Sequence, residues 1–239
     1  MHPRKNSFIG KTYTKMKEKR EENNLEIKEV VDKTEDFIAK NQRMIIVIVS
    51  AILIVVLGYF GVKKFFLEPK EKQAAEALFG AENYFDQENY ELALKGDGKF
   101  LGLIDVIDGY SSTKSGNLAK YYAGMSSLKL GQFEEAISYL TSYKGKDTFT
   151  KILAIIGTGD AYLELGNTSK AIDFYKKAAE NKDNEITAPY ALFKLGVAYY
   201  ADQNNQKALE AFTQIKSNYP QSSEAREMDK YIALIESAK

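Results

Sequence analysis

Four segments of this 239-residue sequence repeat one order of small and large residues. Each has a glycine and, 12 or 13 residues later, an alanine, and three of them place a large side chain four residues after the alanine. The repeated alanines are Ala93, Ala136, Ala171 and Ala208, at spacings of 43, 35 and 37 residues. Such periods are typical of stacked units that cannot bury a core alone. Because glycine lets antiparallel helices approach closely, and a large side chain fills the space between units, we expect an all-α array.

The residue order resembles the tetratricopeptide repeat (TPR), which is about 34 residues long. The fourth segment carries the fullest version: Leu195, Gly196, Tyr199, Ala208, Phe212 and a closing Pro220. The resemblance implies an α-solenoid of about four repeats over residues 74–239. The expected repeats begin at Ala74, Asn117, Ile152 and Pro189, and the last 17 residues, from Ser223 to Lys239, form a capping helix. An unrelated helical bundle is the alternative.

The first repeat departs from this pattern. Gly96 and Gly98 fall inside its expected second helix, where each costs about 1 kcal/mol relative to alanine. With nine extra residues before the next repeat, this predicts a break near Gly96 and a short helix from Lys99 to about Asp108. Gly96, Asp97 and Gly98 are a candidate binding loop, and an insertion without a function is the other interpretation.

One apolar run precedes the repeats. The 19 residues from Met44 to Val62 carry no charge and would span roughly 28 Å as a helix, close to the ~30 Å hydrocarbon core of a bilayer. A buried core helix and a cleavable signal peptide are the alternatives, but no small-x-small cleavage pattern follows the run. We expect a single transmembrane helix, with Ala51 and Gly58 as candidate contacts to another helix.

The sequence on either side of the run gives an ambiguous orientation. Residues 24–43 and residues 63–82 each hold four basic side chains, so the positive-inside rule does not decide. Residues 1–43 carry 11 basic and 8 acidic side chains, a net +3 that favours a cytoplasmic tail. Within this tail, Val30, Val31, Phe37 and Ile38 form a stripe that predicts either a helix lying on the membrane or an extension of the spanning helix. The expected domains are a tail (1–43), a span (44–62), a linker (63–73) and the array (74–239).

The composition excludes several common classes of catalytic site. Cysteine is absent and the only histidine is His2, which removes Cys-based zinc sites, Cys nucleophiles and Ser-His-Asp triads. Lys+Arg and Asp+Glu both number 33, so nothing favours nucleic-acid binding. We find no catalytic constellation, and we expect a non-enzymatic protein without a metal, a cofactor or a small-molecule substrate.

The inner face of such an array is lined by the first helix of each repeat. Its side chains in the last three repeats are mostly aromatic or apolar, which suits a partner peptide or helix. The inward positions are Tyr121, Met125, Lys129, Ile156, Asp160, Glu164, Tyr190, Phe193, Val197 and Tyr200.

The whole layout resembles one bacterial family. EDFIAKNQR before the span, KKFFLEPKEKQAAEALFGAENYF after it and the stretch GDGKFLGLIDVIDGY resemble the YfgM-like family, in the branch found in Bacteroidota. The resemblance implies a single-pass protein of the bacterial inner membrane, with a cytoplasmic N-terminus and a periplasmic array. It also implies an ancillary role at the SecYEG-type translocon beside a membrane-anchored, PpiD-like periplasmic chaperone. The alternatives are an adaptor for envelope assembly or cell division and, more remotely, an organelle import receptor with a cytosolic array.

Overall fold

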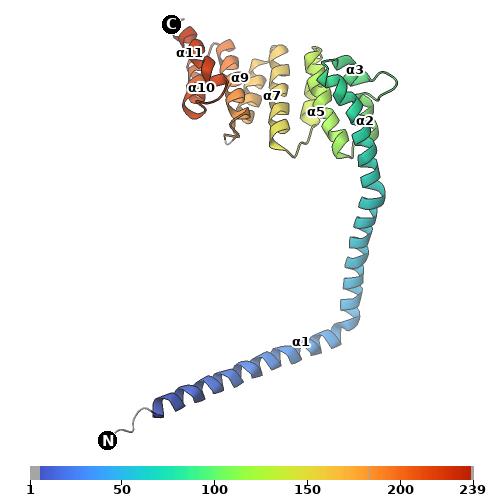
Figure 1. Ribbon diagram of the computed structural model, residues 1–239, viewed down its shortest axis with the longest axis vertical. Coiled ribbons are helices and arrows are strands. Elements are labelled where there is room, and N and C mark those ends of the chain that lie inside the picture. Colours follow the sequence, from blue (N-terminus) through green and yellow to red (C-terminus); the bar gives the residue numbers. More distant parts are fainter. Residues whose placement is uncertain (1–5, 183, 238–239) are drawn as a thin grey trace. The chain divides into compact units, whose positions relative to one another are not determined.

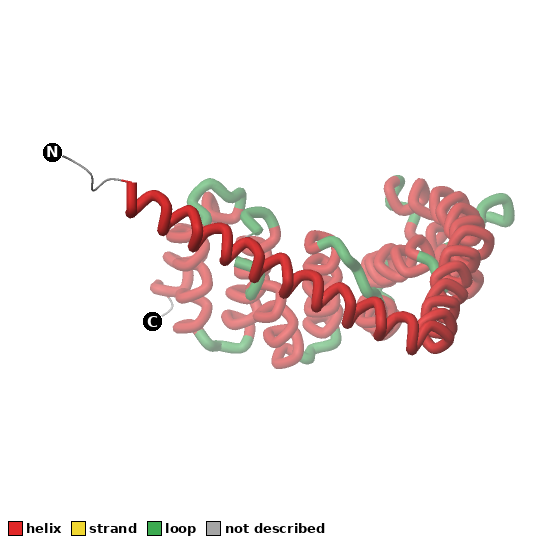
Figure 2. The backbone as a smooth tube through the Cα atoms, turned by 90° about the horizontal axis from the view of Figure 1, so that it is seen from below, coloured by secondary structure: helices red, strands yellow, loops and turns green. Residues whose placement is uncertain are grey.

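The chain is all-α over the residues that the structure describes. The computed structural model describes residues 6–182 and 184–237, except for the side chains of residues 6–27, 29–32 and 36. Helices and short connections account for this part of the chain, and it contains no strand (Figure 2). The chain divides into two compact units, one ending at Lys64 and the other beginning at Phe65.

The first unit is dominated by helix α1 (Asn6–Val62), which carries the whole apolar run (Figure 1). Among the described residues, one helical stretch is long and apolar enough to cross a membrane, and none of its apolar window is buried. Residues 30–42 continue into this stretch within one helix, as the extension interpretation predicted. Phe37 and Ile38 are exposed, whereas the predicted positions Val30 and Val31 lie outside the described side chains.

A five-residue π-helical turn, η1 (Lys63–Leu67), follows α1 and leads into α2 (Glu68–Asp86). The residues expected to form a linker, 63–73, are therefore helical. Pro69 lies in the first turn of α2, directly after the π-helical turn.

The second unit is a row of antiparallel helix pairs (Figure 1). The pairs are α2 with α3 (Tyr90–Lys95), α5 (Lys114–Lys129) with α6 (Phe133–Ser142), α7 (Thr148–Glu164) with α8 (Thr168–Ala179), and α9 (Thr187–Ala201) with α10 (Asn205–Asn218). Each pair packs on the next, so the array has the nearest-neighbour construction of a solenoid.

One turn design joins the two helices of every pair. A residue with positive φ precedes the cap of the second helix, and the cap N–H donates to a carbonyl in the last turn of the first helix. In three pairs the cap is an asparagine whose side chain accepts from the backbone N–H three residues on: Asn89, Asn167 and Asn204. These caps were not predicted from the sequence, although asparagine before an apolar helix is a known start signal.

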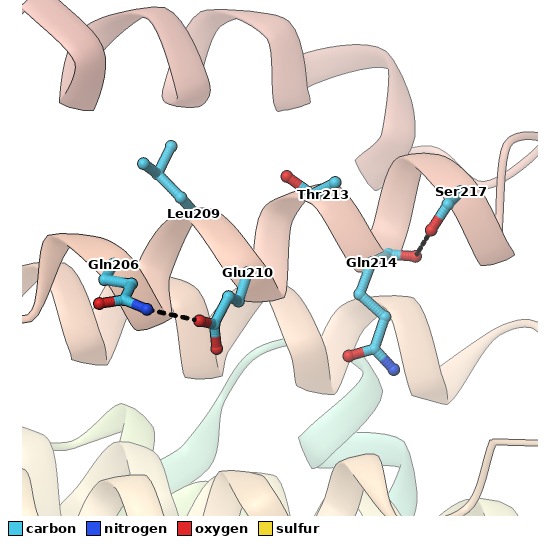
Figure 3. A pocket seen from close by; sticks show the side chains of 6 residues that line it. All are labelled: Gln206, Leu209, Glu210, Thr213, Gln214 and Ser217. Atoms are coloured by element: carbon cyan, nitrogen blue, oxygen red, sulfur yellow. Dashed lines mark hydrogen bonds between the residues drawn. The ribbon is translucent and has the colours of Figure 1, made fainter.

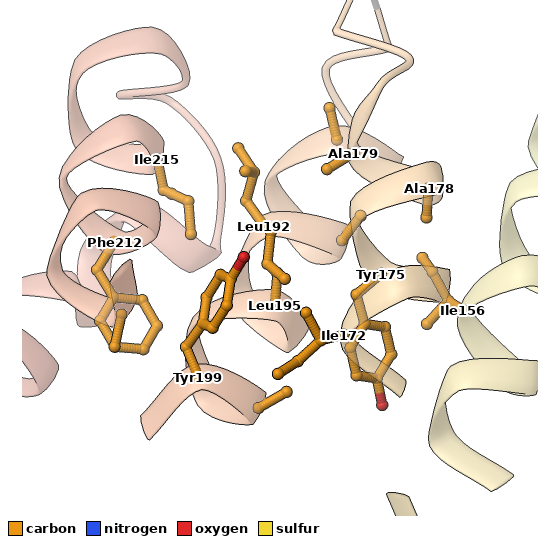
Figure 4. Close-up of a cluster of buried hydrophobic side chains, with 14 of the residues drawn as sticks. Ile156, Ile172, Tyr175, Ala178, Ala179, Leu192, Leu195, Tyr199, Phe212 and Ile215 are labelled. Carbon is orange, nitrogen blue, oxygen red and sulfur yellow. The ribbon is translucent and has the colours of Figure 1, made fainter. Parts of the chain in front are cut away.

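The predicted small–large pairs interlock within the hairpins. A methyl group on Gly124 would lie 2.5 Å from Leu140, and one on Gly159 would lie 2.6 Å from Tyr175. Gly196 faces Phe212 in the same way. The four repeated alanines are fully buried, as expected at the crossing of two helices. Tyr175, Leu192, Tyr199 and Phe212 form part of the largest core cluster, which runs through the last two pairs (Figure 4).

The first pair achieves the same packing by another route. Helix α3 ends at Lys95, a loop follows, and α4 (Leu103–Tyr110) begins four residues later than predicted. Asp97, four residues after Ala93, occupies the sequence position where the other repeats have a large side chain. Phe100, from the loop, lies over Gly80 instead, at 2.8 Å from where a methyl group on Gly80 would sit.

The C-terminal end is closed by a 3-10 turn, η2 (Glu224–Glu227), and helix α11 (Met228–Ser237). The capping helix predicted from Ser223 to Lys239 is therefore interrupted at its start. Met228 and Ile235 are fully buried and belong to the largest core cluster, so α11 covers the last repeat.

Candidate partner-binding face

The predicted inward residues are half-buried, exposed or, at two positions, buried. Met125, Asp160, Tyr190, Phe193 and Val197 are half-buried. Lys129, Glu164 and Tyr200 are exposed. These eight side chains, which we call the inner-face set, come from α5, α7 and α9 and are at least partly exposed.

Two predicted positions are corrected by their burial. Tyr121 is 8% exposed and packs in a small cluster with Leu140 and Ala154. Ile156 is 2% exposed and belongs to the core cluster that includes α8. Tyr121 packs between the second pair and α7, and Ile156 packs into the core of the last two pairs, so neither is available to a partner.

A polar network crosses this face from α7 to α9. Asp160 Oδ1 accepts a hydrogen bond from Tyr175 Oη at 2.6 Å and lies 3.0 Å from Lys194 Nζ. The Lys194 ammonium also lies 5.6 Å from the centroid of the Tyr190 ring. The network therefore joins a first helix, its own second helix and the first helix of the next repeat.

The electrostatics of the network hold both partners of Asp160 in their protonated forms. Burial has the largest effect on Tyr175 and raises its pKa, and the negative charge of Asp160 raises it further. Burial alone would lower the pKa of Lys194, but the Asp160 carboxylate and Tyr190 outweigh it, and the pKa of Lys194 is raised. Asp160 was predicted as an inward residue, whereas Lys194 was not identified.

A second polar pair joins Glu82 of α2, in the first repeat, to Tyr122 of α5, in the second. Burial raises the pKa of Glu82, which accepts a hydrogen bond from the Tyr122 hydroxyl. Burial and, to a smaller extent, the negative charge of Glu82 raise the pKa of Tyr122 to about 12. Tyr122 follows Tyr121 directly, and which of the two reaches the surface depends on a helix rotation that the repeat pattern does not fix.

An apolar hollow lies at the C-terminal end of the inner-face set. It has a volume of about 250 Å³ and is lined by Tyr190 and Phe193 of α9, by Met228 and Tyr231 of α11, and by three polar residues of the connection between helices. The Phe193 and Tyr231 rings meet edge to face, with centroids 5.2 Å apart. A hollow of this size and lining fits one or two apolar side chains of a partner.

A second depression, of about 730 Å³, lies along α10 (Figure 3). Five of its six lining residues are polar, and Gln206 and Glu210 hydrogen-bond to each other at 3.2 Å within it. No predicted site residue lies there.

The candidate binding loop is held by its own aspartate. Asp97 accepts hydrogen bonds from the Tyr84 hydroxyl at 2.7 Å and from the backbone N–H groups of Lys99 and Phe100. These hydrogen bonds lower the pKa of Asp97, and the one from the Phe100 N–H has the largest effect. Gly96 and Gly98 have φ values of 74° and 84°, which glycine adopts without strain. The loop thus has a structural task, because it presents Phe100 to Gly80.

The predicted anchor contact Gly58 has open space around it, since a methyl group there would meet no atom within 4 Å. Ala51 is exposed on the same helix. The described residues contain no group of three or more His, Asp or Glu side chains that could hold a metal ion.

The fold is that of a helical-repeat protein, built from successive helix pairs that pack on one another. Family models described as tetratricopeptide repeat match residues 118–147, 158–185 and 190–222, which are the second, third and fourth predicted repeats. The chain therefore contains tetratricopeptide repeats. It is similar to the "TPR repeat-containing protein MJ1428" of Methanocaldococcus jannaschii, with 23% identity over 149 residues. That match covers 62% of this chain and only 25% of the archaeal protein.

Proposed function

We propose that this protein is a non-enzymatic, membrane-anchored scaffold that binds a protein partner along the inner face of its TPR array. TPR arrays are protein-interaction modules, and the observation that carries the proposal here is the aromatic hollow beside Tyr190 and Phe193. Aromatic and methionine side chains give a surface that adapts to apolar groups of a partner.

The proposal places the apolar run of α1 across the bacterial inner membrane as a single span. The N-terminal tail is cytoplasmic, supported by its net +3 charge, and the array is periplasmic. The partner is a membrane-anchored, PpiD-like chaperone held beside the SecYEG-type translocon, where the complex assists protein export. This assignment rests on the resemblance of the sequence to the YfgM-like family.

The binding face is tested by site-specific photocrosslinking in intact cells. A photoreactive phenylalanine replaces Tyr200, which is exposed on α9, and in a control it replaces Ile186, an exposed apolar residue in the connection before α9. We expect crosslinks to the chaperone from position 200 and none from position 186. Equal crosslinking from both positions would remove the inner face from the proposal.

The translocon assignment has its own test. The intact protein is purified in mild detergent, and its partners are identified by mass spectrometry beside a Tyr190→Ala/Tyr200→Ala variant. Recovery of translocon subunits and the chaperone, with selective loss in the variant, supports the proposal. Recovery of division or cell-wall proteins without the translocon would overturn it in favour of an envelope adaptor.

The topology is tested by labelling, because the chain has no cysteine of its own. Single Ser7→Cys and Ser217→Cys variants are treated with a membrane-impermeant maleimide in spheroplasts. We expect labelling at position 217 before lysis and at position 7 only after lysis. The reverse pattern would mean that the array is cytosolic.

A further inference from the structure

A groove lies between the start of the second unit and the extra helix of the first repeat. We call it the α2–α4 groove: Phe65, Phe66 and Pro69 line one side, and Leu101, Gly109 and Tyr110 line the other. Its volume is about 710 Å³. The phenylalanines are 72% and 71% exposed, although side chains of this size are usually buried in a soluble domain. None of the described residues of the second unit covers them.

The chain itself limits how far this groove can lie from the proposed span. Phe65 follows Val62, the last residue of the apolar run, by three positions, and Pro69 follows it by seven. At 1.5 Å per helical residue, the chain allows these positions to lie at most about 5 and 10 Å beyond the end of the apolar run. The headgroup layer is roughly 5–8 Å deep on each side of a bilayer, so the Phe65 end of the groove starts inside it.

The chemistry of the groove fits this layer. Phenylalanine and proline offer an apolar surface, and Tyr110 offers an apolar body with a polar tip, as side chains at membrane interfaces do. Lys63 and Lys64 directly precede the groove in sequence, and Lys70 lines it, so basic groups are available to lipid phosphates. The one acidic lining residue is Asp105, whose carboxylate accepts from the Gly102 N–H at the opposite end of α4 from Tyr110.

We propose that the α2–α4 groove is a lipid-binding surface that seats the first repeat on the headgroup layer of the membrane holding the anchor. The insertion that breaks the first repeat supplies α4, and with it one side of the groove. The inference rests on the proposed function only in its placement of the span. Lipid bound in the groove would limit the motion of the array relative to its anchor, in addition to the limit set by the single connecting helix.

Intrinsic fluorescence offers a direct test, because the chain has no tryptophan. Gly109→Trp places the probe in the groove, at a position where an added Cβ atom meets no other atom within 4 Å. Ile186→Trp is the matched control, an exposed apolar site outside the groove. Phe60→Trp reports on the apolar run itself. The full-length variants are reconstituted in phosphatidylcholine–phosphatidylglycerol vesicles that carry a nitroxide on the headgroup or on the acyl chain.

We expect the headgroup nitroxide to quench the Gly109→Trp signal at least twofold more than the Ile186→Trp signal. Adding Phe65→Ser and Phe66→Ser should reduce that quenching. If Gly109→Trp is quenched by aqueous acrylamide and not by lipid, the groove faces water and the inference is wrong. Blue-shifted emission without lipid quenching would mean that protein covers the groove, which also overturns it. Loss of acyl-chain quenching at Phe60→Trp would instead refute the span.

Discussion

Single glycines decide how closely the two helices of a repeat approach. Gly159 lies against the ring of Tyr175, which is fully buried and hydrogen-bonded to Asp160, so the ring has no room to retreat. Gly109 is also in a helix but has open space around it. The same substitution therefore has opposite consequences at the two positions.

We predict that Gly159→Ala destabilises the array by about 1–3 kcal/mol, the usual cost of forcing a methyl group into a filled core. Gly109→Ala should be neutral or slightly stabilising, because alanine is the better helix former. Urea unfolding of the two variants in one detergent measures both. Equal stability of the two variants would show that the contact with Tyr175 yields without cost.

Two residues of the first repeat show size complementarity. Phe100 covers Gly80, and its ring meets the Tyr84 ring edge to face at 6.5 Å. Gly80→Ala should clash with Phe100, and Phe100→Ala should remove about 1–2 kcal/mol of apolar contact, since the ring is only partly buried.

The double variant is the informative measurement. Because the smaller side chain at position 100 makes room for the methyl group at position 80, we predict that the double variant is less destabilised than the sum of the two single variants. The difference should be about 0.5–2 kcal/mol in a double-mutant cycle. Strict additivity would mean that Phe100 does not replace the missing large side chain of the repeat.

At the scale of elements, a carboxylate of α2 caps another helix. Glu71 accepts from the backbone N–H groups of Lys114 and Ser115, at 2.6 and 3.0 Å, and from the Ser115 hydroxyl at 2.8 Å. Thr113 caps the same end of α5 by accepting from the Gly116 N–H. The first and second repeats are thus joined by a polar contact as well as by apolar packing.

This contact predicts a dependence of stability on pH. Burial alone would raise the pKa of Glu71, but the hydrogen bonds from Ser115 and Lys114 outweigh it, and its pKa is lowered from 4.5. A carboxylate with a lowered folded-state pKa stabilises the fold above its unfolded-state pKa, and this contribution is lost as pH falls through the folded-state value. Glu71→Ala should cost about 0.5–2 kcal/mol at pH 7, as expected for a lost helix cap.

The difference between wild type and Glu71→Ala should shrink as the pH is lowered below 4.5, measured by urea unfolding at several pH values. Glu76→Ala is the control, because Glu76 is exposed on the same helix and has only a 4.0 Å ion pair with Lys72. A gap between wild type and Glu71→Ala that does not change with pH would argue against a charged cap.

Sequence patterns predicted the helix pairs better than the contacts and burial of individual side chains. The repeat period located four helix pairs, because the small–large complementarity of glycine with Leu140, Tyr175 or Phe212 is local in sequence. The break at Gly96 was also predicted, but Phe100 as the replacement was not, since its role depends on the path of a loop. Burial of Tyr121 and Ile156 was missed, because the rotation of each first helix follows from packing between repeats rather than from the period.

At the scale of the whole molecule, the stability of the array depends on its C-terminal end being covered. Helix α11 closes the last repeat through Met228 and Ile235, and Ile235 is 1% exposed whereas the adjacent Leu234 is 50% exposed. In a repeat array an uncapped end exposes the apolar face of its last unit.

We therefore predict that Ile235→Ala costs about 2–4 kcal/mol, the range for a large side chain truncated in a core. Leu234→Ala should change stability by less than about 0.5 kcal/mol. Thermal unfolding, together with light scattering, separates loss of the cap from simple loss of solubility. Similar melting temperatures for the two variants would show that α11 is not needed to close the array.

The interior of the array is unevenly filled, and this bears on its elasticity. Among the described residues, the buried hydrophobic cluster centred between α5, α6 and α7 has three members, Tyr121, Leu140 and Ala154. In the same helix as Tyr121, the buried hydroxyls of Ser126 and Ser127 have no hydrogen-bond partner. Units that touch only their neighbours carry a pull in series, so an applied force reaches every junction between pairs. Despite the smaller buried cluster, the α5–α6 pair contacts α7 as widely as the α7–α8 pair contacts α9, so we expect the array to bend along its length rather than at one junction.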